Sequence, residues 1–175
     1  MSSSTPDQKG NGPSTPELLI AAVITVSDSC SRGERPDLSG PAVAAVLKSR
    51  SFAIVAQEVV PDEQSAIQKS ILRLGEAARL VVTTGGTGIA PRDVTPEATR
   101  AVCDRLLEGV AERMRSEGAK KTQFAVLSRG VCGVRGASLV LNLPGSPAGA
   151  VESLEAVIEL LPHAIGLLSG HTEHR

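Results

Sequence analysis

Three aspartates lie beyond the ends of apolar, β-rich stretches and are the side chains best suited to metal or acid–base chemistry. They are Asp28, Asp62 and Asp93. Carboxylates that converge repel one another unless a cation lies between them. Mg²⁺ meets this need because it prefers carboxylate and phosphate oxygens as ligands. The aspartates therefore indicate a magnesium site, provided that the fold brings them together.

Each aspartate also has a local alternative role. Asp62 precedes a helical pattern that starts near Glu63 and could cap that helix, and Asp93 could stabilise a turn. Asp28 could bind amide groups of its own loop. The sequence leaves these alternatives open.

A glycine-rich segment supplies the second chemical feature. Residues 83–97 read Thr-Thr-Gly-Gly-Thr-Gly-Ile-Ala-Pro-Arg-Asp-Val-Thr-Pro-Glu. Glycines let the backbone approach a ligand, and Thr95, Pro96 and Glu97 are typical of a helix start, so amide groups can face an anion. The segment lacks the spacing of a P-loop and of a dinucleotide fingerprint. It predicts a phosphate-binding turn, with an ordinary strand-to-helix connection as the alternative. The turn residues are Thr84, Gly85, Gly86, Thr87 and Gly88.

Histidine-based hydrolysis is not expected. His171 and His174 lie in the last five residues, and His163 follows Pro162 inside an apolar helical pattern. A Ser-His-Asp or Cys-His hydrolase therefore lacks its base. Carboxylates, hydroxyls and arginines must carry any reaction.

The composition excludes further classes of protein. A net charge of -1, two Phe and no Tyr or Trp provide neither a basic field nor stacking surfaces for nucleic acid. The odd number of cysteines, Cys30, Cys103 and Cys132, favours reduced thiols in a cytoplasmic protein over a disulfide framework or a zinc site. The longest apolar stretch, residues 18–24, is too short to span a membrane.

The chain pattern predicts a single domain at residues 17–170. Residues 1–16 are polar and rich in Ser, Thr, Pro and Gly, so we expect a flexible extension there, and 171–175 form a short tail. Apolar runs and helical patterns alternate, which favours crossover units and a mostly parallel sheet. The expected strands are 19–26, 52–60, 79–84 and 137–143; the expected helices are 40–50, 63–75, 96–116 in one or two pieces, and 147–169. Residues 124–127 could add a strand or a bend.

The expected fold class is α/β, a three-layer α/β/α domain with an open, mostly parallel sheet. The strands are apolar on successive residues, as expected when helices cover both faces. In such sheets a ligand binds beyond the carboxyl ends of the strands. The segments to inspect begin at Ser27, Pro61, Gly85 and Pro144.

Four segments of the chain resemble the MogA/MoaB family of molybdenum-cofactor biosynthesis proteins, which includes the G domains of gephyrin. The resemblance spans roughly residues 19–169 and is carried by 83–99, Val-Pro-Asp-Glu at 60–63, Leu-Ser-Arg-Gly at 127–130 and Asn-Leu-Pro-Gly-Ser-Pro at 142–147.

The resemblance implies a molybdopterin-binding-like fold, commonly a homotrimer, and transfer of AMP from ATP to molybdopterin with Mg²⁺, releasing pyrophosphate. It implies that Asp62 and Asp93 are catalytic and bind the metal, and that Ser128 is catalytic and handles the pterin. A molybdenum-insertion protein is the implied downstream partner. The substrate-binding residues are expected to be Ser27, Asp28, Thr84, Gly85, Gly86, Thr87, Gly88, Arg129, Asn142, Pro144, Gly145 and Ser146. Arg92 is a further candidate.

The sequence leaves three other functions open. One is a MoaB-type protein that binds molybdopterin with little or no adenylyl transfer. Another is a non-catalytic scaffold module, and the third is a nucleotide-sugar or dinucleotide pyrophosphatase. Apolar positions in residues 97–117 and 148–168 suit either burial between subunits or ordinary core packing.

Overall fold

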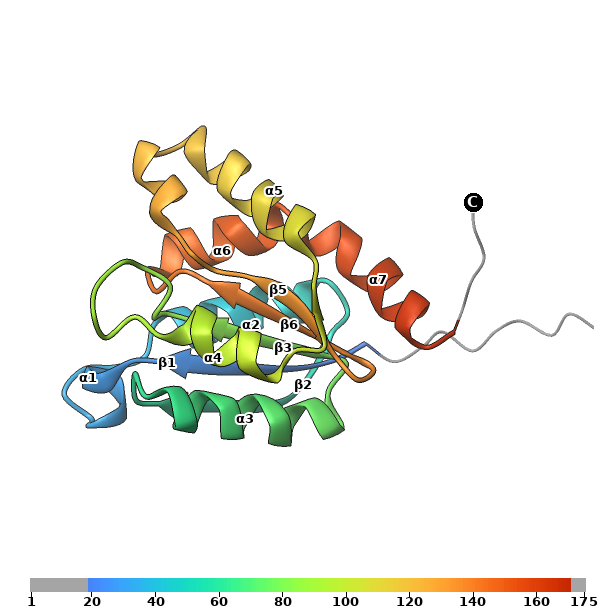
Figure 1. Ribbon diagram of the computed structural model, residues 1–175, viewed down its shortest axis with the longest axis horizontal. Helices are drawn as coiled ribbons and strands as arrows, with labels where there is room; N and C mark the ends of the chain where they lie inside the picture. Colours follow the sequence, from blue (N-terminus) through green and yellow to red (C-terminus); the bar gives the residue numbers. More distant parts are fainter. Residues whose placement is uncertain (1–18, 171–175) are drawn as a thin grey trace, which may run out of the picture.

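The computed structural model describes residues 19–170, so the predicted N-terminal extension and C-terminal tail lie outside the described residues. A six-stranded sheet with the order β2-β1-β3-β6-β5-β4 forms the middle layer (Figure 1). Its strands are β1 (Ile20–Val26), β2 (Ala53–Val60), β3 (Leu80–Thr84), β4 (Arg105–Leu106), β5 (Cys132–Arg135) and β6 (Ser138–Leu143). The first four in the order are parallel, and β5 and β4 pair antiparallel. The predicted open, mostly parallel sheet is confirmed.

Helices cover both faces of this sheet. They are α1 (Asp28–Ser31), α2 (Ser39–Ser49), α3 (Gln64–Ala77), α4 (Thr95–Val102), α5 (Glu108–Ala119), α6 (Pro147–Glu155) and α7 (Leu161–Leu168). The apolar sides of α3 and α4 share one core cluster, and those of α2, α5, α6 and α7 share the other (Figure 1). The predicted three layers are therefore present.

The two clusters explain why the central strands are apolar on successive residues. Side chains alternate across a strand, so Ala21 and Val23 of β1 enter one cluster while Ala22 and Ile24 enter the other. The edge strand β2 instead alternates exposed and half-buried residues. Burial on both faces thus requires the continuous apolar runs.

Parallel pairing brings the carboxyl ends of four strands to one edge. Val26 at the end of β1 pairs with Val60 of β2, and Thr25 pairs with Thr84 of β3. Thr84 in turn pairs with Leu143 at the end of β6. The segments that follow these strands therefore meet at the edge on the left of Figure 1, where α1 lies.

Several local predictions differ from the structure. The helix predicted over 96–116 in one or two pieces is present as two pieces, α4 and α5, but the strand β4 between them was not predicted. Residues 123–127 form a 3₁₀ turn. The strands β4 and β5 carry no apolar run long enough to indicate them, since β4 has two residues and β5 contains Gly133. The predicted helix over 147–169 divides into α6, a 3₁₀ turn at Ile158–Leu160 and α7, which has a proline in its first turn.

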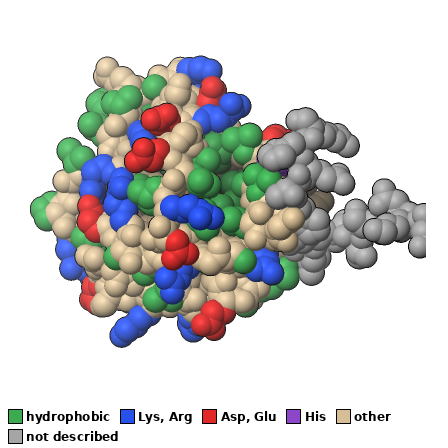
Figure 2. Space-filling view, turned by 45° about the vertical axis from the view of Figure 1, so that its right-hand side comes forward, with side chains coloured by type: hydrophobic (Ala, Val, Ile, Leu, Met, Phe, Trp, Pro, Cys, Tyr) green, Lys and Arg blue, Asp and Glu red, His purple; other side chains and the backbone are tan. Residues whose placement is uncertain are grey.

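The surface agrees with the modest net charge. Figure 2 shows acidic and basic side chains interspersed on one face, with hydrophobic side chains gathered in its upper half. Within residues 19–170, no helix is long and apolar enough to cross a membrane.

The three cysteines, Cys30, Cys103 and Cys132, form no disulfide bond. Burial raises the pKa of Cys103 to about 11 and that of Cys132 to about 12, so both are poor nucleophiles.

Candidate functional site

A cavity of about 740 Å³ lies at the carboxyl edge of the sheet, and we call it the first hollow. It is bordered by the segments that follow β1, β2, β3 and β6. The predicted site residues that line it are Ser27, Asp28, Asp62, Thr84, Gly85, Gly86, Asp93, Gly145 and Ser146. The fold therefore brings the three aspartates and the glycine turn to one space.

A second cavity of about 510 Å³, the second hollow, lies on the other side of the glycine turn. The two hollows share Gly86, Asp93, Gly145 and Ser146. The predicted site residues that line the second hollow are these four with Thr87, Gly88, Ser128, Asn142 and Pro144. Its apolar lining includes Met114, Phe124 and Leu127. Two ligands bound in these hollows would meet at the shared residues.

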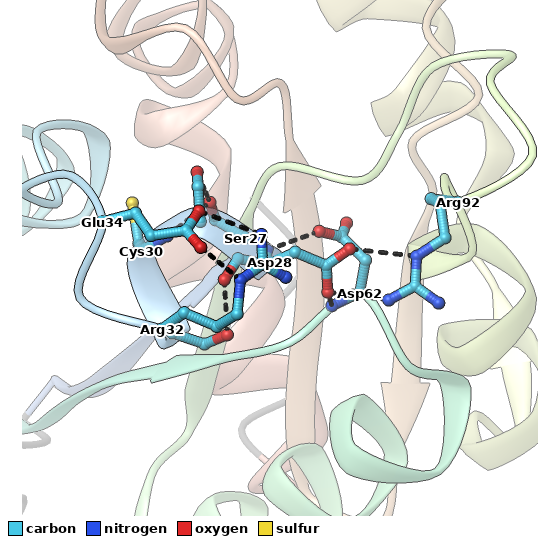
Figure 3. Close-up of polar contacts among 9 residues, drawn as sticks. Ser27, Asp28, Cys30, Arg32, Glu34, Asp62 and Arg92 are labelled. Carbon is cyan, nitrogen blue, oxygen red and sulfur yellow. Dashed lines mark hydrogen bonds and ion pairs between the residues drawn. The ribbon is translucent and has the colours of Figure 1, made fainter.

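Asp28 and Asp62 are joined by reciprocal hydrogen bonds (Figure 3). The Asp28 amide donates to Asp62 Oδ2 at 2.8 Å, and the Asp62 amide donates to Asp28 Oδ1 at 3.0 Å. Arg92 donates from Nε and Nη2 to the two carboxylate oxygens of Asp28, at 3.0 and 2.7 Å. Asp28 therefore links three of the segments that form the hollow, and its carboxylate is fully engaged.

The local alternatives for Asp28 and Asp62 are corrected by these contacts. The helix α3 begins at Gln64, its cap residue is Glu63, and no side chain caps it. Asp62 is therefore not a helix cap. Asp28 does bind a backbone amide, but that amide belongs to Asp62 in another segment.

The two carboxylates have different electrostatic environments. Burial raises the pKa of Asp62, and the negative charges of Asp28 and Asp93 raise it further. The hydrogen bond from Arg92 lowers the pKa of Asp28, with help from the Asp62 amide. The charged form of Asp28 is thus stabilised. The charged form of Asp62 is disfavoured, so a bound cation would stabilise it.

The glycine turn is held in a conformation that favours glycine. Gly85 has φ 93° and Gly86 has φ 66°. Thr95 was expected to cap α4, but the cap residue is Val94, and the buried Thr95 hydroxyl donates instead to the Gly85 carbonyl at 2.9 Å. The amide groups of residues 86–88 donate no hydrogen bond to any other residue that the structure describes. These amides are free to bind an anion.

Asp93 has both a local and a shared role. Its Oδ2 accepts a hydrogen bond from the Ala90 amide at 2.9 Å, as the turn alternative predicts. The carboxylate also lies close to the glycine turn, because a Cβ added at Gly88 would be 2.7 Å from Asp93 Oδ2. A Cβ at Gly86 would be 3.2 Å from Asp62 Oδ1. The two carboxylates therefore flank the same short turn.

Arg129 lies outside both hollows. Its guanidinium forms an ion pair with Glu97 and donates to the carbonyls of Gly88 at 2.8 Å and Asp93 at 2.7 Å. The hydrogen bond from Arg129 lowers the pKa of Glu97. The contacts of Arg129 hold the glycine turn in place, and the substrate contact expected from the sequence stays a prediction.

Asn142 is buried at the boundary of the second hollow. Its amide group donates to the hydroxyls of Thr83 at 3.0 Å and Thr99 at 2.9 Å, and its Oδ1 accepts from the Val131 amide. A buried polar side chain with all these bonds stabilises the fold around the site. Ser128, by contrast, is half-buried, and among the described residues its hydroxyl accepts only a long bond of 3.4 Å from the Gly130 amide.

The first hollow includes residues that the sequence prediction missed: Arg32, Arg35, Asp37 and Ser39. Asp37 accepts hydrogen bonds from the Thr25 hydroxyl at 2.7 Å and the Gly40 amide at 3.0 Å. Ser39 shares a hydrogen bond with Thr84 at 2.8 Å. The polar segment 31–39 after the first strand could have indicated that this part of the chain borders the site. Its sequence does not show which of its residues line the hollow.

Comparisons with known proteins identify the family to which the chain belongs. Residues 22–163 match the family described as "Probable molybdopterin binding domain". The chain is 42% identical over 159 residues to the molybdopterin adenylyltransferase of Helicobacter pylori J99, covering 89% of this chain and 90% of that one. It is 41% identical to the Drosophila melanogaster molybdenum cofactor synthesis protein cinnamon over 87% of this chain, but it spans only 26% of that protein.

A solved structure extends the comparison. The molybdopterin biosynthesis enzyme MoaB from Thermus thermophilus superposes with a TM-score of 0.82 and 52% identity. The match covers 87% of this chain and 98% of that one.

Proposed function

Because the chain belongs to the molybdopterin-binding domain family of molybdenum-cofactor biosynthesis proteins, as the MogA/MoaB resemblance predicted, we propose that it transfers AMP from ATP to molybdopterin. The observation that carries this proposal is the pair of hollows joined at Gly86, Asp93, Gly145 and Ser146. Two substrates that react with each other need such a junction.

The first hollow takes ATP and the second takes molybdopterin. The terminal phosphate oxygen of the pterin forms a bond to the α-phosphorus of ATP. The bond from that phosphorus to the bridging oxygen breaks, and pyrophosphate leaves with the electron pair. The free amides of residues 86–88 bind the phosphate that passes between the hollows, which offsets the repulsion between two polyanions.

The carboxylates suit a magnesium ion bound together with a substrate. No group of three or more His, Cys, Asp or Glu side chains in residues 19–170 forms a metal cage. Mg²⁺ is usually held by one or two carboxylates together with substrate phosphates. Asp62 and Asp93 fit this donor set, because they line one hollow and the Asp28 carboxylate is already engaged by Arg92. When bound, the ion would neutralise phosphate charge.

The test is the ATP consumption of the purified protein. We expect adenylyl-molybdopterin and pyrophosphate only when ATP, molybdopterin and Mg²⁺ are all present, and none after EDTA. Chromatography of the products with a coupled pyrophosphate assay measures both. ATP hydrolysis without molybdopterin would instead indicate a pyrophosphatase.

A MoaB-type function is the second candidate, and the 52% identity to the Thermus thermophilus MoaB structure favours it. Such a protein would bind molybdopterin in the second hollow but form little adenylyl-molybdopterin. Molybdopterin binding without product in the same assay would select this function. A scaffold module would neither bind molybdopterin in the second hollow nor turn ATP over.

Ser128→Ala should weaken molybdopterin binding with little effect on ATP. Ser128 lines the second hollow but not the first, and its hydroxyl has one weak bond to the residues that the structure describes, so it remains available to the pterin. Loss of one hydrogen bond corresponds to a rise of roughly 3- to 10-fold in the KM for molybdopterin. Steady-state kinetics with each substrate varied in turn measures this.

Ser49→Ala is the matched control, since Ser49 is an exposed residue at the end of α2 whose hydroxyl donates to the Val46 carbonyl. An unchanged KM for molybdopterin in Ser128→Ala would remove Ser128 from the proposal.

The homotrimer and the downstream molybdenum-insertion partner implied by the resemblance stay predictions. Exposed apolar side chains such as Ile89, Phe124 and Val126 offer surface for such contacts.

A further inference from the structure

The segment between α1 and α2 brings two arginines to the first hollow. Arg32 and Arg35 both line it, together with four aspartates. A hollow with this balance of charge repels a nucleotide triphosphate unless cations compensate. Binding of a triphosphate therefore requires a cationic side chain that is not already paired within the protein.

Arg32 is already paired. It donates from Nε to Glu34 Oε1 at 2.7 Å and from Nη2 to Oε2 at 3.0 Å. Figure 3 shows this pair on one side of Asp28, with Arg92 on the other. Arg92 is likewise committed to Asp28 through two bonds. Neither guanidinium is free for a ligand without breaking a bidentate pair.

Arg35 differs from both. It is exposed at the border of the first hollow, and it has no hydrogen bond or ion pair with any residue in the described range 19–170. The nearby carboxylate of Asp37 is occupied by Thr25 and Gly40. Arg35 is therefore an unpaired cation beside a cavity that is otherwise acidic.

The position of Arg35 also indicates which phosphates it can contact. The reacting α-phosphorus must lie at the junction of the hollows, near Gly86 and Asp93. Arg35 lines the first hollow but not the second, so it borders the space assigned to ATP and not the space assigned to the acceptor. The β- and γ-phosphates point away from the attacking group in an in-line displacement.

We propose that Arg35 binds the β- and γ-phosphates of ATP and retains the departing pyrophosphate. This inference rests on the proposed adenylyl transfer, because it takes the first hollow as the ATP site. Arg35 contacts the leaving group, whereas Asp62 and Asp93 act at the α-phosphate. The pairing of Arg32 with Glu34 leaves this task to Arg35.

The experiment compares Arg35→Met with wild type by calorimetric titration with ATP, AMP and inorganic pyrophosphate, each with Mg²⁺. Losing one charge-assisted contact should raise the Kd for ATP and for pyrophosphate by about 10- to 100-fold. The Kd for AMP should change by less than about 3-fold, since AMP lacks both phosphates that Arg35 contacts. The effect should shrink as salt is added, because Arg35 is exposed.

Two further variants complete the design. Arg35→Lys keeps the charge and should recover part of the affinity for pyrophosphate. Arg105→Met is the matched control, because Arg105 is exposed on β4 and lines neither hollow. Its Kd values should equal those of wild type.

The outcomes separate this inference from the proposed function. If wild type binds ATP and pyrophosphate and Arg35→Met binds them equally well, the role of Arg35 is wrong while the adenylyl transfer stands. An equal loss of AMP affinity would also overturn it, because the contact would then not be with the leaving group. Failure of wild type to bind either ATP or pyrophosphate would overturn both.

Discussion

Asp62→Asn is expected to lower the turnover of adenylyl transfer by roughly 10²- to 10⁴-fold. The side chain lies in the first hollow, close to the glycine turn, and its raised pKa marks a carboxylate that lacks a cation in the free protein. An asparagine keeps the shape and an oxygen that can accept the Asp28 amide bond. It removes the charge that Mg²⁺ needs.

The measurement is the initial rate of adenylyl-molybdopterin formation at saturating ATP and molybdopterin. Glu63→Gln is the matched control, since Glu63 is the adjacent acid and lines neither hollow. Asp93→Asn should show a loss of the same order, because Asp93 borders both hollows. Near-normal turnover in both aspartate variants would refute the metal site.

The raised pKa of Asp62 also predicts how stability and activity depend on pH. Burial raises that pKa above its ordinary value of 3.8, so the folded protein holds the proton more tightly than the unfolded chain. The free energy of unfolding therefore falls as the pH rises from 3.8 through the folded pKa, and the loss persists at neutral pH. Asparagine carries no such penalty. We expect Asp62→Asn to be at least as stable as wild type at neutral pH, although its turnover is much lower.

Thermal unfolding of both proteins across the acid to neutral range checks the sign. The Tm of wild type relative to Asp62→Asn should decline with rising pH. Activity should follow the opposite trend, because metal binding requires the ionised carboxylate. A large loss of stability in Asp62→Asn at neutral pH would mean that Asp62 is chiefly structural.

Gly85→Ala is expected to destabilise the protein by about 2–5 kcal/mol. The positive φ of 93° costs about 1–2 kcal/mol for a residue with a side chain. An added Cβ would also collide with the backbone carbonyl of Val26, which cannot rotate away as a side chain can. Overpacking of this kind adds about 1–3 kcal/mol.

Denaturant unfolding monitored by circular dichroism measures this loss. Gly109→Ala is the control: Gly109 is exposed in α5, and nothing lies within 4 Å of the position that its Cβ would occupy. Alanine there should stabilise the protein by about 0.5–1 kcal/mol, since it favours the helix. A Gly85→Ala protein as stable as wild type would show that the turn can rearrange.

Loss of the turn geometry should also reduce activity in whatever protein remains folded. The Gly85 amide donates to the Leu143 carbonyl, and the Gly85 carbonyl accepts from Thr95. These bonds fix the free amides of residues 86–88 between the two hollows. A shift of the turn would therefore separate the phosphate-binding amides from Asp62 and Asp93.

The sequence by itself determined the features that depend on consecutive residues. Apolar runs identified four strands to within a residue or so of their ends, because a strand buried on both faces must be apolar throughout. The glycine turn, Asp28 and Asp62 were recognisable because each comes within two residues of the end of one of these strands, and Asp93 because it lies in the segment that continues from the glycine turn. The short strands β4 and β5 were missed, since pairing with neighbours rather than composition makes them strands.

Only the tertiary structure decided what each side chain contacts. The reciprocal hydrogen bonds between the backbone amides and carboxylates of Asp28 and Asp62 join residues 34 positions apart in the sequence. Arg92 binds Asp28 across 64 positions. Through these contacts Asp28 positions Asp62 and Arg92, and Arg92 pairs with Asp28 and not with Asp62. Arg129 and Arg35 show the same effect: the first is paired with Glu97, and the second has no side-chain partner among residues 19–170. Local patterns encode the backbone, whereas long-range packing sets the charge that each functional group meets.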